Sequence, residues 1–241
     1  MRSLIAILLA VLFTVTLTFG SSPDLVAAKR PKVYVLSTLH QLHDKTPYYS
    51  FDELTRIIDR IDPHIIVVEL APADLASRKE QANKQEYQRS VFPLAEKRGY
   101  ELVAMEPSEP KFSEIVGLVR SSESALRAAS PDKGAAFTVY ANYLWEHLLG
   151  TWKSPADVNS AETDAMFAVK HGFQNELFGP DQKKGWEAWN QHFLDRITET
   201  AQKNPSKRIL VLAGAEHGYW LRSRLAAQDG LELVAAAKMF K

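Results

Sequence analysis

The stretch that decides the fold is Lys32-Val33-Tyr34-Val35-Leu36, a short and almost continuous apolar run. Runs of this kind are typical of a strand buried on both faces of a parallel sheet. Two more follow, at residues 64–68 and 100–105, and helical patterns separate the three. A strand–helix–strand–helix–strand order implies right-handed crossovers. We therefore predict an α/β fold with a mostly parallel sheet flanked by helices.

Capping and turn residues place the first helices. Ser50 and Glu53 have the spacing of a capping box, so a helix begins there, and Asp62-Pro63 ends it. Pro72 opens a long polar stretch that we expect to be helical as far as about Lys97.

The middle of the chain is expected to be helical, because apolar residues recur there in three stripes at helical spacing. Strands return at residues 207–213 and 231–234, with a helix at 218–227 between them. We interpret residues 29–241 as a single α/β domain with a helical insertion at about residues 111–203. The alternative is an independent second domain.

Composition limits the classes of function. A chain of 241 residues with 46% hydrophobic content is sufficient for one sizeable globular domain. Lysine plus arginine and aspartate plus glutamate both number 29, so the formal net charge is zero. This balance argues against a nucleic acid partner. The lack of cysteine excludes disulfides, thiolate metal sites and a cysteine nucleophile.

The N-terminus has the pattern of a secretory signal. Arg2 precedes an apolar stretch from Leu4 to Phe19, and the small residues Gly20 and Ser21 follow. We expect residues 1–28 to be a signal peptide that exports the protein to the periplasm or the medium. The alternative is an uncleaved membrane anchor, which is the one way in which we expect the protein to associate with a membrane.

Polar side chains follow the apolar runs where the predicted strands end. His40, Glu69 and Glu106 follow the first three strands, and His217 follows the run that ends at Ala213. In an open parallel sheet, ligands bind outside the carboxyl ends of the strands, so we expect one cleft there. His40, Glu69 and His217 are therefore candidate catalytic residues, which either hold a divalent metal or move protons directly. Their donor types leave zinc, manganese and cobalt open.

Four further residues are expected to contact a substrate: Gly214, Glu106, Asn190 and Tyr219. Gly214 permits a tight turn before a helix, whose free N–H groups can stabilise an oxyanion. Asn190 is a polar residue on an apolar stripe, so it either reaches the site or ties two helices together. His171 lies off the apolar face of its helix, and we expect it to be solvated.

At these residues the chain resembles the TraB/Tiki superfamily, which includes GumN-like proteins, erythromycin esterases and ChaN-like haem-binding lipoproteins. That group has a Gly-x-x-His after the first strand, a Glu after the second, and another Gly-x-x-His near the C-terminus. The matching residues here are Ser37 to His40, Glu69, and Gly214 to His217. Ser37 departs from the pattern by replacing the first glycine. Trp189 replaces the arginine of an Arg-Asn pair whose asparagine is Asn190.

The resemblance implies an exported hydrolase, because Tiki proteins are metal-dependent peptidases and erythromycin esterases hydrolyse an ester. Under this hypothesis His40, Glu69 and His217 cleave a peptide or ester bond, with or without a metal. The alternative is a non-catalytic protein that binds a peptide, another small molecule or haem in the same cleft. In that case His40, His43 or Tyr219 contacts the ligand.

Overall fold

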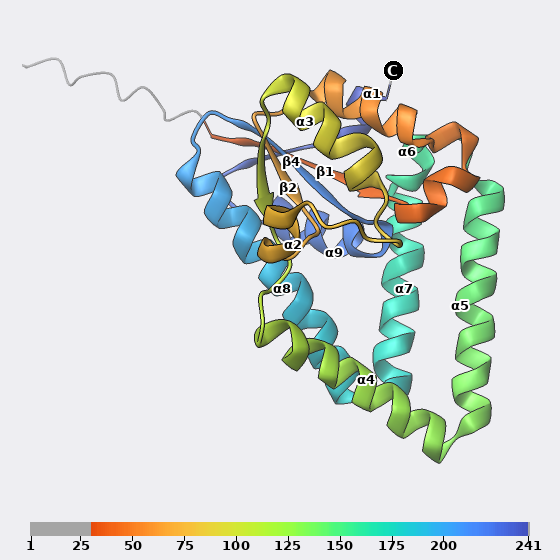
Figure 1. The fold of residues 1–241 in the computed structure, drawn as a ribbon. Coiled ribbons are helices and arrows are strands. Elements are labelled where there is room, and N and C mark those ends of the chain that lie inside the picture. Colours follow the sequence, from red (N-terminus) through yellow and green to blue (C-terminus); the bar gives the residue numbers. More distant parts are fainter. Residues whose placement is uncertain (1–29, 241) are drawn as a thin grey trace, which may run out of the picture.

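The computed structural model of the chain describes residues 30–240, so the predicted signal peptide lies outside the described residues. Five parallel strands form one sheet in the order β3-β2-β4-β1-β5, which confirms the α/β prediction (Figure 1). The strands are β1 (Lys32–Thr38), β2 (Ile65–Val68), β3 (Glu101–Ala104), β4 (Arg208–Gly214) and β5 (Glu232–Val234). The strands run in the same direction, so their carboxyl ends lie at one edge of the sheet.

Alternate residues of the strands pack into two apolar layers. Tyr34, Leu36 and Ile66 face the helices α1 (Phe51–Ile61) and α3 (Phe92–Arg98). Val33, Val35 and Ile65 face α8 (Pro180–Lys203) and α9 (Ala215–Ala226). Both faces of the sheet are therefore covered, which explains why the strands read as continuous apolar runs.

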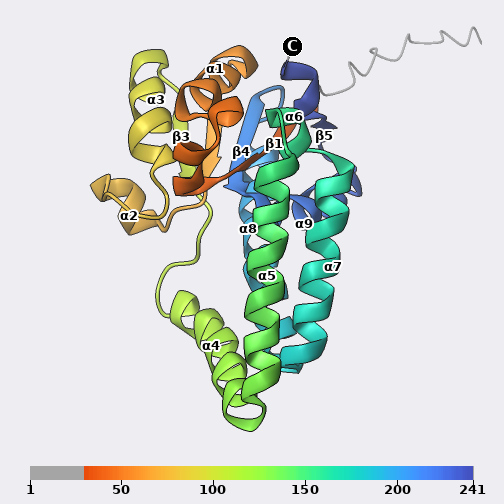
Figure 2. The same cartoon turned by 90° about the vertical axis from the view of Figure 1, so that its right-hand side faces the viewer.

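The segment between β3 and β4 is helical over the residues that the sequence indicated. Figures 1 and 2 show its long helices extending away from the sheet. The segment contains α8 and four further helices, α4 (Lys111–Ala129), α5 (Pro131–Thr151), α6 (Pro155–Val158) and α7 (Ala161–Phe178). None of the helices formed by residues 30–240 has the length and hydrophobicity needed to span a bilayer.

Short turns complete the fold between the longer elements. Two 3-10 turns follow β1, namely η1 (His40–Lys45) and η2 (Pro47–Tyr49), and a third, η4 (Ala236–Met239), lies near the C-terminus. The predicted capping box is present, because the Ser50 side chain accepts a hydrogen bond from the Glu53 N–H. Asp62 then ends α1 in a left-handed conformation.

The prediction of one long helix over residues 72–97 is wrong. α2 (Pro72–Ser77) ends at Arg78, which has φ +52° and therefore turns the chain out of the helix. Residues 79–85 form a loop without helix. A π-helical turn, η3 (Tyr87–Val91), then leads into α3. This loop carries Lys84 to the strand ends.

Candidate active site

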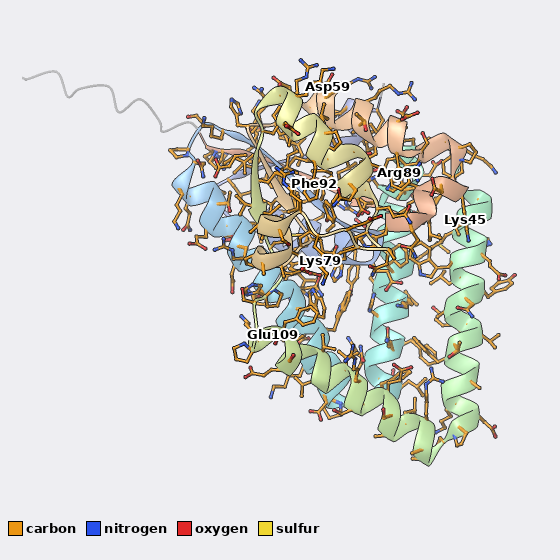
Figure 3. All side chains as sticks on the ribbon, in the orientation of Figure 1. Lys45, Asp59, Lys79, Arg89, Phe92 and Glu109 are labelled. Carbon is orange, nitrogen blue, oxygen red and sulfur yellow. The ribbon has the colours of Figure 1, made fainter. Side chains whose placement is uncertain are left out.

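The carboxyl ends of four neighbouring strands bring four of the predicted residues together. In sheet order, Glu106 follows β3, Glu69 follows β2, Gly214 ends β4 and His40 follows β1. A cleft of about 720 Å³ lies here, and we call it the strand-end cleft. Its walls include His40, Glu69, Lys84 and Glu106. In Figure 3, the labelled Lys79 and Glu109 mark the segments after α2 and before α4 that border this cleft.

His40 is held by a buried carboxylate. Its Nδ1 lies 2.7 Å from Glu86 Oε1, and the Glu86 side chain is completely buried. Thr38 also donates its hydroxyl hydrogen to Glu86 Oε1. The other ring nitrogen, Nε2, lies 3.8 Å from Glu69 Oε1, and the His40 side chain remains 25% exposed. Glu86 thus fixes the orientation of the His40 ring, and part of the ring remains exposed to the cleft.

The backbone at His40 is in an uncommon conformation. Its φ is +51°, in the left-handed region that a residue with a Cβ adopts rarely. Such conformations cost of order 1 kcal/mol or more and cluster at functional sites. The imidazole packs against Gly214 at the end of β4, the strand that pairs with β1.

Gly214 serves this packing rather than a special backbone angle. A Cβ at residue 214 would lie 2.6 Å from His40 Nε2, closer than real Cβ contacts come. The Gly214 N–H donates to Glu69 Oε2 over 2.6 Å. The N–H that we expected to stabilise an oxyanion is therefore engaged by a carboxylate of the protein.

A buried lysine joins the two strand-end carboxylates. Lys84 Nζ lies 3.1 Å from Glu69 Oε1 and 2.6 Å from Glu106 Oε1, and it also donates to the Glu69 carbonyl oxygen. Glu69, Lys84 and Glu106 are 4%, 8% and 7% exposed, so these charges interact with little screening by water. Such a lysine fixes both carboxylates in place.

The surroundings shift the pKa values of Glu69 and Glu106 in opposite directions. Burial alone would raise the pKa of Glu69, but Lys84, the two imidazoles His217 and His40, and the Gly214 N–H lower it to about 2. Burial raises the pKa of Glu106, and the charge of Glu69 adds to this, so that together they outweigh Lys84. Glu69 is thus a carboxylate at neutral pH, whereas Glu106 holds a proton more readily than an ordinary glutamate.

The pKa of His40 is raised. Burial would lower it, but the charge of Glu86 and its hydrogen bond, with a further contribution from Glu69, raise it above the ordinary 6.5. An imidazole whose pKa is raised in this way accepts a proton more readily than an ordinary histidine, which suits a general base.

His217 lies beside this cleft and lines a second cavity. Its Nδ1 lies 2.8 Å from Asn190 Oδ1, which favours a proton on that nitrogen. Burial lowers the pKa of His217 to about 4, so the ring is neutral at physiological pH. The second cavity, of about 460 Å³, lies among α4, α7, α8 and α9, and we call it the helical pocket. Phe112 and Trp189 line both cavities.

The other residues predicted to contact a substrate or ligand form hydrogen bonds within the fold. Asn190 is fully buried and also donates to the Trp186 carbonyl, so it ties α8 to α9. The Tyr219 hydroxyl accepts a hydrogen bond from the Trp186 indole. His43 is 1% exposed, with Nδ1 2.6 Å from the Tyr49 carbonyl and Nε2 accepting from the Leu39 N–H. Both of its nitrogens are therefore engaged within the fold.

The expectation that His171 is solvated is wrong. His171 is only 2% exposed. Its ring stacks on the ring of Trp186 with 3.7 Å between the centroids, and its Nε2 lies 2.8 Å from Glu216 Oε2. α7 packs against both α8 and α9, so the helix is covered on more than the single face that its stripe indicates.

Sequence reasoning missed Lys84 and Glu86, which complete the site. Neither residue follows a strand, and both fall in the stretch that was expected to be one polar helix. Three contacts fix their loop. The Tyr87 hydroxyl accepts from the Glu69 N–H, the Asn83 carbonyl accepts from the Gln41 N–H, and Lys84 binds the Glu69 carbonyl. The local sequence pattern of a charged segment does not predict such long-range contacts.

The predicted metal ligands His40, Glu69 and His217 are divided between two cavities. Among residues 30–240, no group of three or more His, Asp and Glu side chains has the geometry to hold a metal ion. The position of a cation beside Glu69 and Glu106 is taken by the Lys84 ammonium. His217 directs one nitrogen to Asn190 and lines the other cavity.

Comparisons of the chain with protein-family models, with curated proteins and with solved structures returned no match.

Proposed function

We propose that the protein is an exported hydrolase that cleaves an ester or peptide bond in the strand-end cleft. The observation that carries this proposal is the orientation of His40 by the buried Glu86, with Nε2 left toward Glu69. A carboxylate behind an imidazole selects one tautomer and stabilises the ring when it gains a proton. This is the arrangement that a general base requires.

The base acts on water in this mechanism. The 3.8 Å between His40 Nε2 and Glu69 Oε1 is too long for a direct hydrogen bond and leaves the two atoms to be bridged by a water. His40 takes a proton from that water as its oxygen attacks the substrate carbonyl carbon. Glu86 balances the imidazolium charge that forms. Glu69, which stays ionised, orients the water.

Glu106 supplies the acid. Burial and the charge of Glu69 raise its pKa, which makes it the better proton donor of the two strand-end carboxyl groups as the carbonyl carbon–oxygen or carbon–nitrogen bond breaks. The proton passes to the leaving oxygen or nitrogen, and the proton held by His40 afterwards restores Glu106 through solvent. Lys84 has an acceptor for each of its three N–H groups, so it positions Glu69 and Glu106 and does not contact the substrate.

The resemblance to the TraB/Tiki superfamily supports the same reaction class, since the group includes peptidases and an esterase. Export is part of the proposal and rests on the signal pattern in residues 1–28. A metal-dependent reaction, with zinc, manganese or cobalt, stays a prediction. So does non-catalytic binding of a peptide or haem. Engagement of both nitrogens of His43 and of the Tyr219 hydroxyl within the fold counts against these two residues as ligands in the binding alternative.

A substrate panel tests the proposal. Purified protein is incubated with short peptides and with small carboxylic esters, each with and without EDTA, and its metal content is measured by elemental analysis. We expect turnover that EDTA does not reduce. Loss of turnover in EDTA together with a stoichiometric metal would favour the metal-dependent hydrolase. Saturable binding without turnover would favour the binding protein, and a Soret band after reconstitution would identify a haem protein.

A further inference from the structure

The large apolar side chains that are exposed to solvent gather on two neighbouring helices. Among residues 30–240 they are Val139 and Tyr143 of α5 and Val169 and Phe173 of α7, with exposed fractions between 44% and 70%. Single exposed apolar residues are ordinary in proteins, whereas a contiguous apolar patch marks an interaction surface. The position of these four side chains therefore decides whether they form such a surface.

The four side chains border one groove between α5 and α7. Tyr143 and Val169 line this groove, which has a volume of about 520 Å³. Phe173 follows Val169 by one turn of α7 and packs edge to face on Tyr140, which also lines the groove. Val139 precedes Tyr143 by one turn of α5. We call the groove and the four exposed side chains the α5–α7 face.

α5 is apolar on its outer side as well as on the side that packs against the fold. Phe137 and Leu144 are buried, whereas Val139 and Tyr143 on the other side are exposed. Residues 134–145 contain no charged side chain. Figure 2 shows α5 at the front of the molecule, with no other element over it. A helix that is apolar all round is normally covered all round, so the outer side of α5 lacks a partner within one chain.

Charged residues flank the α5–α7 face and leave its centre uncharged. A second protein surface can therefore cover the centre without burying a charge, which would be costly. Of the five exposed charged residues on the two helices, four are acidic, and this balance disfavours the anionic surface of a bilayer as the partner. These five residues are Asp132, Lys133, Glu146, Glu162 and Glu176.

The size of the face is sufficient for a dimer. α5 has 21 residues and α7 has 18. At 1.5 Å per residue and a helix diameter of 10 Å or more, the pair presents a surface of about 30 by 20 Å, or about 600 Å². Two copies in contact through this surface bury about 1,200 Å², which is within the range of specific protein interfaces.

We propose that the α5–α7 face binds the same face of a second copy of this chain. In a twofold-symmetric contact a surface meets itself, so it needs both a projection and a recess. The α5–α7 face has both, because Tyr143 is 70% exposed beside the groove. Two helices from each copy then pack as a four-helix layer. The face shares no residue with the strand-end cleft, so the inference does not rest on the proposed hydrolase function.

The mass of the intact protein in solution tests the inference. Sedimentation equilibrium is measured over a wide range of protein concentration. We expect the mass of two chains at high concentration and dissociation to single chains on dilution, because dimerisation follows mass action. The mass of one chain at every concentration would overturn the inference, and so would assembly that continues beyond two chains.

A charge placed on the face locates the contact. Val169→Lys introduces two lysines into a symmetric interface, and the dissociation constant of the dimer should rise about 100-fold or more. Val169 is 66% exposed in the single chain, so the variant should keep its fold, which circular dichroism checks. Gln191→Lys is the matched control, because Gln191 is an exposed residue of α8 outside the face. Equal dissociation constants in the two variants contradict the inference.

A single thiol reports directly whether the face is covered. The chain contains no cysteine, so Tyr143→Cys and Gln191→Cys each carry one reactive group. With a maleimide in excess, Tyr143→Cys should react more slowly as the protein concentration rises, whereas the rate for Gln191→Cys should stay constant. A constant rate for Tyr143→Cys would overturn the inference. Binding of single chains to phosphatidylcholine vesicles that Val169→Lys abolishes would also overturn it and would assign the face to a membrane.

Discussion

The imidazole of His40 occupies the space that a side chain on residue 214 would fill, because Nε2 lies 2.6 Å from the position of a Cβ there. His40 follows β1 and Gly214 ends β4, two neighbouring strands, so the contact depends on their parallel pairing at Thr38 and Gly214. Glycine at this position therefore determines where the candidate base lies.

Gly214→Ala should displace the imidazole from Glu69 while the protein stays folded. The φ of Gly214 is −52°, a conformation that alanine adopts without strain, so the effect is steric and local. We expect kcat/KM for an ester or peptide substrate to fall about 100-fold, as misplacement of a catalytic group commonly causes. Gly172→Ala is the matched control, since nothing lies within 4 Å of its added Cβ. Equal activity in the two variants would show that the contact is unimportant.

Glu86→Gln should change the pH dependence of hydrolysis. His40 acts as a base in its neutral form, and Glu86 raises its pKa above 6.5, so kcat/KM should rise with pH through a midpoint above 6.5. Without the Glu86 charge, burial lowers this pKa, and the midpoint should move to lower pH. The maximum rate should also fall, by about 10- to 1,000-fold, since the imidazolium loses its counter-charge. An unchanged midpoint in the pH profile would rule out His40 as the base that is titrated.

Lys84→Met should destabilise the protein by about 3–5 kcal/mol at neutral pH, because the buried carboxylate of Glu69 loses its counter-ion and Glu106 loses the same hydrogen-bond partner. Lys183→Met is the control, since Lys183 is an exposed residue 3.9 Å from Glu187, and its loss should cost about 0–1 kcal/mol. Urea unfolding at pH 7 measures both differences.

Protonation of Glu69 at falling pH should stabilise the Lys84→Met variant, whereas it destabilises the unmodified protein. In the unmodified protein the pKa of Glu69 is about 2 against 4.5 for an ordinary glutamate, so its stabilisation is present above pH 4.5 and is lost as the pH falls toward 2. In Lys84→Met, burial should raise that pKa above 4.5, and the variant should recover stability as the pH falls through it. A deficit that is constant with pH would contradict this account of Glu69.

His217 should make the folded protein sensitive to mild acid. Burial lowers its pKa to about 4, whereas the unfolded value is 6.5, so the folded state binds this proton less readily. Stability should decline by up to about 3 kcal/mol as the pH falls from 6.5 through 4. His217→Gln should remove this part of the slope in urea unfolding at pH 7, 5 and 4. A slope equal to that of the unmodified protein would place the acid sensitivity elsewhere.

Sequence reasoning located the residues whose positions follow from strand ends. Apolar runs identify the strands, and parallel pairing then requires His40, Glu69 and Glu106 to lie at one edge of the sheet. The turn at Gly214 was recognised, but its N–H binds Glu69 and not a substrate oxygen. The helix after it begins at Ala215, earlier than expected, which puts His217 in the first turn of α9, where it meets Asn190.

The residues that were missed depend on contacts between distant segments. Glu86 and Lys84 bind groups that follow β1, β2 and β3, and their loop exists because Arg78 adopts a left-handed conformation that helical periodicity does not foretell. The expectation for His171 was wrong for a related reason, because α7 packs against both α8 and α9 and part of its buried surface is polar. Periodicity identifies an apolar face and carries no information about a buried polar one.

The most direct test of the account is hydrolysis by His40→Asn in the presence of EDTA. Asparagine tolerates the left-handed conformation of residue 40, so this change removes the imidazole without new backbone strain. His147→Asn is the control, since His147 is exposed on α5 and lies outside the strand-end cleft. We predict that the unmodified protein and His147→Asn hydrolyse an ester or peptide equally in EDTA, whereas His40→Asn has no more than residual activity. Equal turnover in both variants, or turnover that EDTA abolishes in the unmodified protein, would contradict a metal-independent reaction at His40.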